Sequence, residues 1–130
     1  MISEEPNSIS GAPVQTVAVF SIDKVLPETI NNILENIFGK KGKESLLHAM
    51  EKRYSLKRGE ILDNVQGFAD ALHEILGSGS VIIEDLILET VYAKLNVEFE
   101  WKKDYRFSDY VNEVRIITKK VKAGSWLTAT

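Results

Sequence analysis

The chain has 130 residues, 44% hydrophobic and 27% charged, which predicts one globular domain with enough apolar material for its own core. The absence of cysteine excludes disulfide bonds, thiolate metal sites and a cysteine nucleophile. The formal net charge of −3 argues against nucleic-acid binding by the whole surface. Because the N-terminal sequence lacks the basic and apolar regions of a signal peptide, and the longest apolar stretch is too short to span a bilayer, we expect a cytoplasmic protein.

The first twenty residues differ in character from the rest of the chain. Residues 1–13 are rich in serine, proline, glutamate and asparagine, and they predict a disordered arm. Residues 14–20, with the sequence VQTVAVF, are β-branched and aromatic, and they predict a short strand. A lone strand needs a pairing partner, for which residues 97–101 and a second copy of the protein are the two candidates.

Five helices follow, because the apolar residues now recur with the helical period. We expect Pro27 to begin the first helix, residues 42–56 to form the second, and Asp63, Ser80 and Ser108 to begin the other three. Gly39, Gly77 and Gly124 stand where helices one, three and five would end. The residues expected to face the core are Ile30, Ile33, Leu34, Ile37, Phe38, Leu46, Leu47, Met50, Tyr54, Val65, Phe68, Ala69, Leu72, Ile75, Leu76, Tyr110, Val111, Val114, Ile117 and Val121.

Two of these helix starts have further features. Asp63 and Gln66 have the spacing of an N-cap and its N3 partner, which predicts a capping box. The helix that Ser80 would cap runs to about residue 95 and is apolar nearly all round. Such a helix lies at the centre of a core or is shared with a partner subunit.

The chain contains an internal similarity. Leu34, Gly39 and Tyr54 align with Leu72, Gly77 and Tyr92, each 38 residues later. The repeated unit is a helix, a glycine turn and a second helix that ends in tyrosine. We therefore expect an all-α bundle of about five helices built from two similar helical hairpins, forming one domain over residues 14–124 with a tail at 125–130.

These patterns, taken together, resemble a known family. The shared elements are a first Phe-Gly, a helix ending in tyrosine, Ile61 followed by Phe68, a second Leu-Gly-x-Gly, and Ile83-Glu84-x-Leu86-Ile87 before Tyr92 and Leu95. Over roughly residues 30–99 they resemble an archaeal family of helical domains of unknown function, named after Nitrosopumilus output domains. The resemblance implies an all-helical module that is sometimes attached to signalling proteins as an output, and it brings no catalytic residues.

The stretch FGKKGKE, residues 38–44, is the most suggestive local motif. It does not match a phosphate-binding P-loop, because Glu44 follows Gly42-Lys43 and the preceding segment is helical. It is then either a plain turn between helices or a place where lysines near a helix start contact anions. The wider segment 40–58 is basic and is followed by an acidic one, so it is also a candidate for contact with nucleic acid. The candidate contact residues are Lys40, Lys41, Lys43, Arg53, Lys57 and Arg58.

Catalytic and metal-binding patterns are weak. His48 and His73 show neither a Ser-His-Asp order nor the zinc spacing H-E-x-x-H. Asp70, His73 and Glu74 share one helix at metal-ligand spacing, but this face has the character of a solvated surface, which is the favoured interpretation. We therefore predict no enzyme, no cofactor and no metal.

Aromatic and basic residues alternate in the segment FEWKKDYRF, residues 99–107. Such aromatics fold onto the core, anchor a protein partner or stack on the bases of single-stranded nucleic acid. The candidate partner contacts are Trp101, Tyr105 and Trp126. We expect a non-enzymatic interaction or regulatory module that acts through protein–protein contacts and forms a homodimer. The alternative is a nucleic-acid-binding protein that uses the basic segment 40–58.

Overall fold

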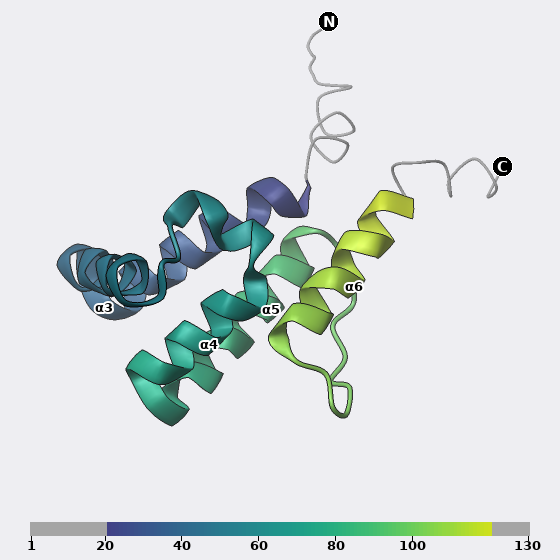
Figure 1. Ribbon diagram of the computed structural model, residues 1–130. Helices are drawn as coiled ribbons and strands as arrows, with labels where there is room; N and C mark the ends of the chain where they lie inside the picture. Colours follow the sequence, from purple (N-terminus) through teal and green to yellow (C-terminus); the bar gives the residue numbers. More distant parts are fainter. Residues whose placement is uncertain (1–20, 121–130) are drawn as a thin grey trace, which may run out of the picture.

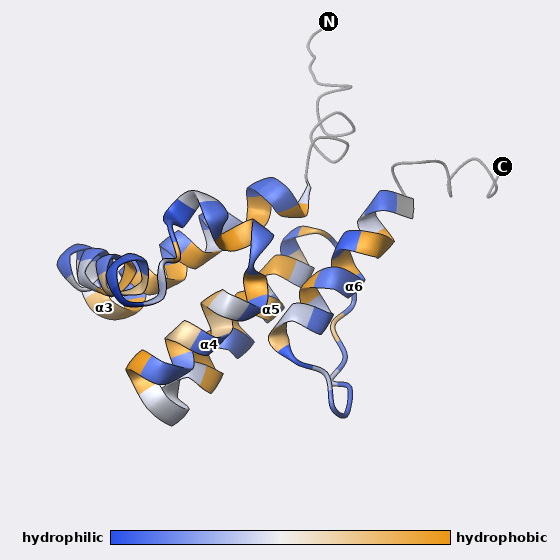
Figure 2. Cartoon of the chain, in the orientation of Figure 1, coloured by the Kyte–Doolittle hydropathy of each residue, from blue (hydrophilic) through white to orange (hydrophobic). Residues whose placement is uncertain are grey.

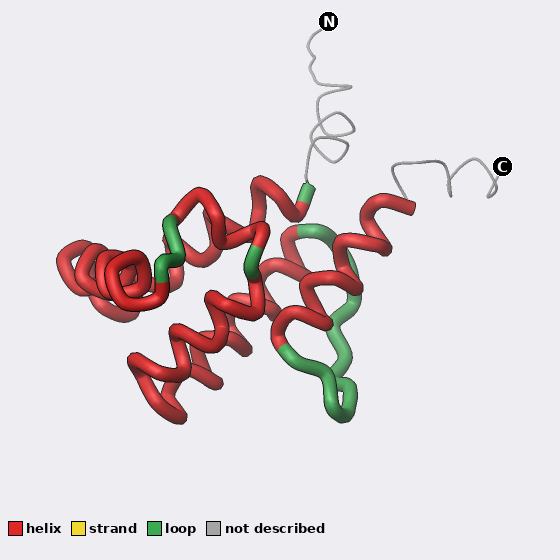
Figure 3. Tube along the Cα trace, viewed as in Figure 1, coloured by secondary structure: helices red, strands yellow, loops and turns green. Residues whose placement is uncertain are grey.

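The computed structural model describes residues 21–120, and its ordered elements are all helical (Figures 1 and 3). They are α3 (Ile22–Tyr54), the 3₁₀ helix η1 (Arg58–Asp63), α4 (Val65–Leu76), the 3₁₀ helix η2 (Gly77–Gly79), α5 (Ser80–Lys94) and α6 (Phe107–Lys120). The all-α prediction is confirmed for this part of the chain. The expected arm 1–13, strand 14–20, helix end at Gly124 and tail 125–130 lie outside the described residues, as do Val121 and Trp126. Residues 97–101, a candidate partner for that strand, form no strand.

Helix α3 changes direction at Gly39, the position where a break was predicted. Gly39 has φ 77° and ψ 171°, a conformation that is essentially restricted to glycine. In Figure 1 the segment before Gly39 runs across the picture, whereas the segment after it is seen nearly end-on. Two helical segments of different direction therefore meet at this one residue.

The start of α3 was predicted wrongly. The helix begins at Ile22, and Pro27 lies inside it rather than at its first position. Proline removes one backbone hydrogen bond from a helix interior. The carbonyl group that loses its partner belongs to Asp23, which is an exposed residue. Ile22, Val25 and Leu26 are buried and hold this extra turn against the core.

Three residues of α3 that were predicted to face the core are instead exposed. Ile37 and Phe38 immediately precede the break at Gly39, and their side chains are 45% and 36% exposed. Tyr54, in the last turn of α3, is 37% exposed. The change of direction explains the first two, since the core-facing stripe of the first segment is buried only as far as Leu34.

Two predicted helix caps are also corrected. The N-cap of α4 is Asn64, whose side-chain oxygen accepts a hydrogen bond from the Gly67 backbone N–H at 3.0 Å, so Asp63 is not the cap. The 3₁₀ helix η1 extends through Asp63 and moves the start of α4 one residue along the chain. Ser80 is the first residue of α5 and makes no capping hydrogen bond, because its hydroxyl group contacts His73 instead.

Helix α5 lies at the centre of the fold and contacts α3, α4 and α6. Figure 2 shows hydrophobic residues concentrated where the helices face one another. The fully buried side chains include Leu26, Leu34 and Met50 of α3, Phe68 and Leu72 of α4, Ile87, Val91 and Tyr92 of α5, and Val111 and Val114 of α6. The central position predicted for α5 is correct, but only part of its apolar surface is covered within the described chain.

The longest connection, residues 95–106, joins α5 to α6 (Figure 3). It turns at Asn96 and Asp104, which have φ of 59° and 67° and are residue types that tolerate positive φ. Helix α6 begins at Phe107, one residue before the predicted start. Its side chains at Tyr110, Val111 and Val114 are buried as expected, whereas Ile117 is 36% exposed.

The two aligned glycines have similar backbones. Gly77 has φ 65° and ψ −144°, in the same glycine-favouring region as Gly39, and it ends α4 as predicted. Leu34 and Leu72, five residues before each glycine, are both fully buried. The likeness does not extend to the ends of the units, because Tyr92 is fully buried and Tyr54 is exposed.

Candidate functional site

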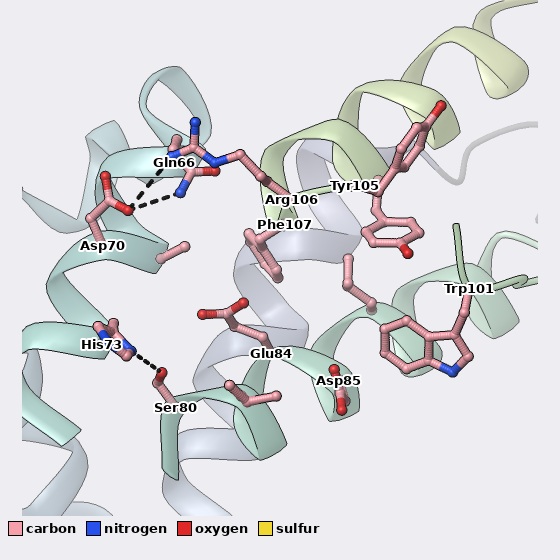
Figure 4. Close-up of a pocket in the computed structure, with 14 residues that line it drawn as sticks. Gln66, Asp70, His73, Ser80, Glu84, Asp85, Trp101, Tyr105, Arg106 and Phe107 are labelled. Atoms are coloured by element: carbon pink, nitrogen blue, oxygen red, sulfur yellow. Dashed lines mark hydrogen bonds and ion pairs between the residues drawn. The ribbon is translucent and has the colours of Figure 1, made fainter. Parts of the chain in front are cut away.

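A groove of about 390 Å³ lies between α4, α5, the end of the 95–106 connection and the first turn of α6 (Figure 4). Gln66, Asp70 and His73 line it from α4, and Val81, Glu84 and Asp85 line it from α5. Trp101, Tyr105 and Arg106 complete it from the connection. We call this the acidic groove, because three of these side chains are carboxylates.

The connection is fixed beside the groove by α6. The Tyr110 hydroxyl lies 2.8 Å from the backbone nitrogen of Lys102, which donates to it, and 3.2 Å from the Lys102 carbonyl oxygen. The Lys102 ammonium group also pairs with Glu113. The Trp101 and Tyr105 rings pack edge-on against the Tyr110 ring, with centroids 6.0 and 5.0 Å away. These contacts hold two partly exposed aromatic side chains at one wall of the groove.

The Tyr92 hydroxyl links α5 to α6 in the interior. It lies 2.8 Å from the Tyr110 carbonyl oxygen and 2.8 Å from Glu113 Oε1, two acceptors that share its one proton. Burial and the neighbouring Glu113 carboxylate raise the pKa of Tyr92, so it stays protonated. Burial opposes ionisation of Glu113, but hydrogen bonds from Lys102 and Tyr92 outweigh it and lower the pKa of Glu113.

The opposite wall of the groove is polar. Asp70 Oδ1 accepts a hydrogen bond from Gln66 Nε2 at 2.9 Å and lies 3.9 Å from the guanidinium group of Arg106. Arg106 is itself fixed by the start of α6, because its backbone N–H donates to Asp109 Oδ2 at 2.8 Å. His73 Nδ1 lies 3.3 Å from Ser80 Oγ.

Glu84 and Asp85 carry the groove's remaining negative charge. Figure 4 shows the Glu84 carboxylate in the middle of the groove, with Asp70 and His73 on one side and Trp101 and Tyr105 on the other. Burial, together with the charge of Asp85, raises the pKa of Glu84, and burial together with Glu89 raises that of Asp85. Both carboxylates are partly buried, and neither has a hydrogen bond or ion pair within residues 21–120. A cation in the groove would favour the ionised forms of Glu84 and Asp85 and would therefore oppose the rise in both pKa values.

The contact between the Ser80 hydroxyl group and the His73 ring resembles that of a serine nucleophile with its general base. Ser80 has no exposed surface, so a substrate carbon cannot reach its hydroxyl group. Within residues 21–120, His73, Asp70 and Glu74 are not placed so that they could hold a metal ion together, nor is any other group of three such residues. The groove thus places carboxylates beside aromatic side chains.

The structure divides the predicted basic contact residues. Lys43 is buried, and its ammonium group donates to Glu35 Oε1 at 2.7 Å, a bond that lowers the pKa of Glu35. Arg58 pairs with Glu44 across the turn that follows α3. The side chains of Lys40, Lys41, Arg53 and Lys57 are exposed. Lys43 is therefore part of the internal structure of α3, and its charge is already matched.

Two of the predicted partner-contact aromatics line the acidic groove, whereas none of the predicted basic contact residues does. Trp101 and Tyr105 both line the acidic groove and are 60% and 40% exposed. The sequence did not predict Glu84, Asp85 or Arg106 as contact residues. The adjacent acids Glu84 and Asp85 inside a mainly apolar helix were a usable signal, because burying an unpaired charge is costly.

Within residues 21–120, no helix combines the length and the apolar character needed to cross a membrane. Comparison with models of protein families, with curated proteins and with solved structures finds no match. The resemblance to the output-domain family therefore stays a prediction.

Proposed function

We propose that this protein is a non-enzymatic interaction module that acts through protein–protein contacts and forms a homodimer. Its regulatory, output-like character follows the archaeal family resemblance. The observation that carries the proposal is an apolar patch on α5, formed by Val81, Ile82 and Leu86, which are 52%, 65% and 41% exposed. We call it the α5 patch.

The three side chains of the α5 patch lie within the first two turns of the helix. Ile82 and Leu86 are four residues apart and share one face, and Val81 adjoins them. The opposite face of α5 carries the buried Ile83, Ile87 and Val91, so the helix is already anchored without the patch. Exposed apolar surface of this kind marks interaction sites, and a two-fold axis would let two copies of the patch cover each other.

The test is the mass of the protein in solution. We expect a concentration-dependent dimer in sedimentation velocity, and Ile82→Glu should weaken dimerisation by about tenfold or more, because it would bury an unpaired charge in the interface. Ile116→Glu on α6 is the matched control, since Ile116 is 55% exposed and lies off the patch. A wild-type protein that remains a monomer at high concentration would contradict the homodimer.

Nucleic-acid binding is the second candidate function. The observation that favours it is the exposure of Lys40, Lys41, Arg53 and Lys57 on one basic stretch of chain. If duplex DNA binds there, affinity should fall with salt, and replacing Lys40 and Lys41 with glutamine should reduce the log–log salt slope by about 2. Lys43→Gln should leave the slope unchanged, because Lys43 is already paired with Glu35. The absence of a shifted complex at low salt would eliminate this candidate.

A further inference from the structure

The acidic groove has more negative than positive charge. Asp70, Glu84 and Asp85 face it, and among the described residues Arg106 is the one guanidinium group in its lining. Arg106 lies near Asp70, at 3.9 Å, and within residues 21–120 it forms no ion pair with Glu84 or Asp85. Two carboxylates therefore remain unmatched inside a partly enclosed space, where charge interactions are stronger than in bulk water.

The wall beside these carboxylates is aromatic. Trp101 and Tyr105 are held in place by the Tyr110 ring, but they leave a large part of their own surface exposed. Aromatic faces attract cations, and tryptophan does so most strongly. Lys102 Nζ already lies over the Tyr105 ring, 5.2 Å from its centroid, so the aromatic surface open to a ligand is that of Trp101, which is 60% exposed. The carboxylates and the Trp101 ring together are complementary to a flat, positively charged group.

We propose that the acidic groove binds an arginine side chain presented by a segment of a partner protein. The guanidinium group is planar, bonds carboxylates in a bidentate manner and stacks on aromatic rings, whereas the lysine ammonium group is compact and strongly hydrated. Glu84 and Asp85 would accept hydrogen bonds from the guanidinium, and Trp101 would stack against it. Val81 and Leu88 also line the groove, and they would contact the aliphatic stem of the arginine.

The dimensions of the groove agree with this occupant. Its volume of about 390 Å³ exceeds that of one side chain and leaves room for neighbouring backbone. Its rim carries the exposed residues Val81, Trp101 and Tyr105, so a chain segment can lie across the opening. The inference rests on the proposed function, because it names the chemistry of a partner for an interaction module.

The experiment follows peptide binding by the fluorescence of Trp101, which lines the groove. The chain has two tryptophans, so the full-length Trp126→Phe protein reports from Trp101 alone. It would be titrated at low salt with the capped peptide Gly-Arg-Gly-Arg-Gly, and in parallel with the same peptide containing citrulline, a neutral analogue of arginine. We expect a saturable change in Trp101 fluorescence with the arginine peptide and no saturable change with the citrulline peptide.

Paired substitutions separate the groove from general attraction to acidic surface. Glu84→Gln with Asp85→Asn should weaken arginine-peptide binding by about tenfold or more, because charge-assisted hydrogen bonds are lost. Glu51→Gln with Glu74→Gln removes the same number of charges from exposed positions outside the groove and should change binding by less than about twofold. Circular dichroism would establish that each variant is folded.

Three results would overturn the inference. They are equal binding of the arginine and citrulline peptides, equal weakening by the groove pair and the control pair, and no saturable binding at low salt. The proposed homodimer is tested separately by sedimentation of the Ile82→Glu variant. A protein that dimerises but fails the peptide titration would therefore lose the groove assignment while the proposed function stands.

Discussion

Replacing Gly39 with alanine tests the break in α3 directly. Gly39 has φ 77° and ψ 171°, and a Cβ atom built there meets no atom within 4 Å. The substitution therefore creates no clash, and its cost comes from the backbone conformation alone. That cost is about 1–3 kcal/mol, and the reduced freedom of the unfolded chain offsets about 0.4–1 kcal/mol of it. We expect Gly39→Ala to lower the free energy of unfolding by about 1–2 kcal/mol.

Urea unfolding followed by far-ultraviolet circular dichroism measures this change, and the m-value should stay constant. Gly79 provides the matched control, because a Cβ atom there also meets nothing within 4 Å, whereas its φ of −64° and ψ of −19° are ordinary for alanine. Gly79→Ala should leave stability unchanged or increase it by up to about 1 kcal/mol. The two substitutions are chemically identical, but only Gly39→Ala should lower the free energy of unfolding.

Equal unfolding midpoints for Gly39→Ala and Gly79→Ala would refute the reasoning, because the positive φ at Gly39 would then carry no cost. Gly77→Ala extends the test to the internal similarity. Gly77 has φ 65° and also has open space around its Cβ position, so its substitution should cost about as much as that of Gly39. A loss at one glycine without a loss at the other would show that the two turns are not equivalent.

Three further outcomes can be measured by the same unfolding assay. Tyr92→Phe should cost about 1–2 kcal/mol, since it removes the hydroxyl group that donates to the buried Tyr110 carbonyl oxygen and to the partly buried Glu113 carboxylate. Tyr54→Phe at the aligned exposed position should change stability by less than about 0.5 kcal/mol. Asn64→Ala should cost about 1 kcal/mol through loss of the α4 cap, and Asp63→Ala should cost clearly less. Glu84→Gln should stabilise the protein at pH 7, because burial raises the folded-state pKa of Glu84 and its ionised form is disfavoured there. This gain should disappear at about pH 3, where the carboxyl group is protonated in both the folded and unfolded states; a gain that is independent of pH would contradict it.

The turns of this fold could be predicted because single residues determine them. Gly39 and Gly77 both adopt backbone conformations that favour glycine, and the sequence shows each glycine directly. Helix starts were less predictable, since neighbouring residues offer the same chemistry. Asp63 and Asn64 are both good caps, and the choice between them depends on how far η1 extends.

Burial at the ends of helices could not be predicted from periodicity, because it depends on neighbours that are distant in the sequence. Tyr54 and Tyr92 occupy aligned positions, but only Tyr92 is covered by α6 and bonded to Tyr110. The acidic groove has the same limitation. Asp70, Glu84 and Trp101 come from three elements, and only the packing of α4, α5 and the connection brings them together.

The α5 patch and the acidic groove adjoin each other on one helix, and this links the two proposals. Val81 belongs to both, and Asp85, four residues later, lies on the same side of α5. A two-fold dimer formed through the patch would place the Asp85 carboxylates of both copies near the interface, where like charges oppose association. An arginine bound in each groove would neutralise them, so the arginine peptide should tighten dimerisation and dimerisation should tighten peptide binding by the same factor. Sedimentation with and without the peptide measures this coupling, and a peptide that dissociates the dimer would show that patch and groove compete for one partner surface.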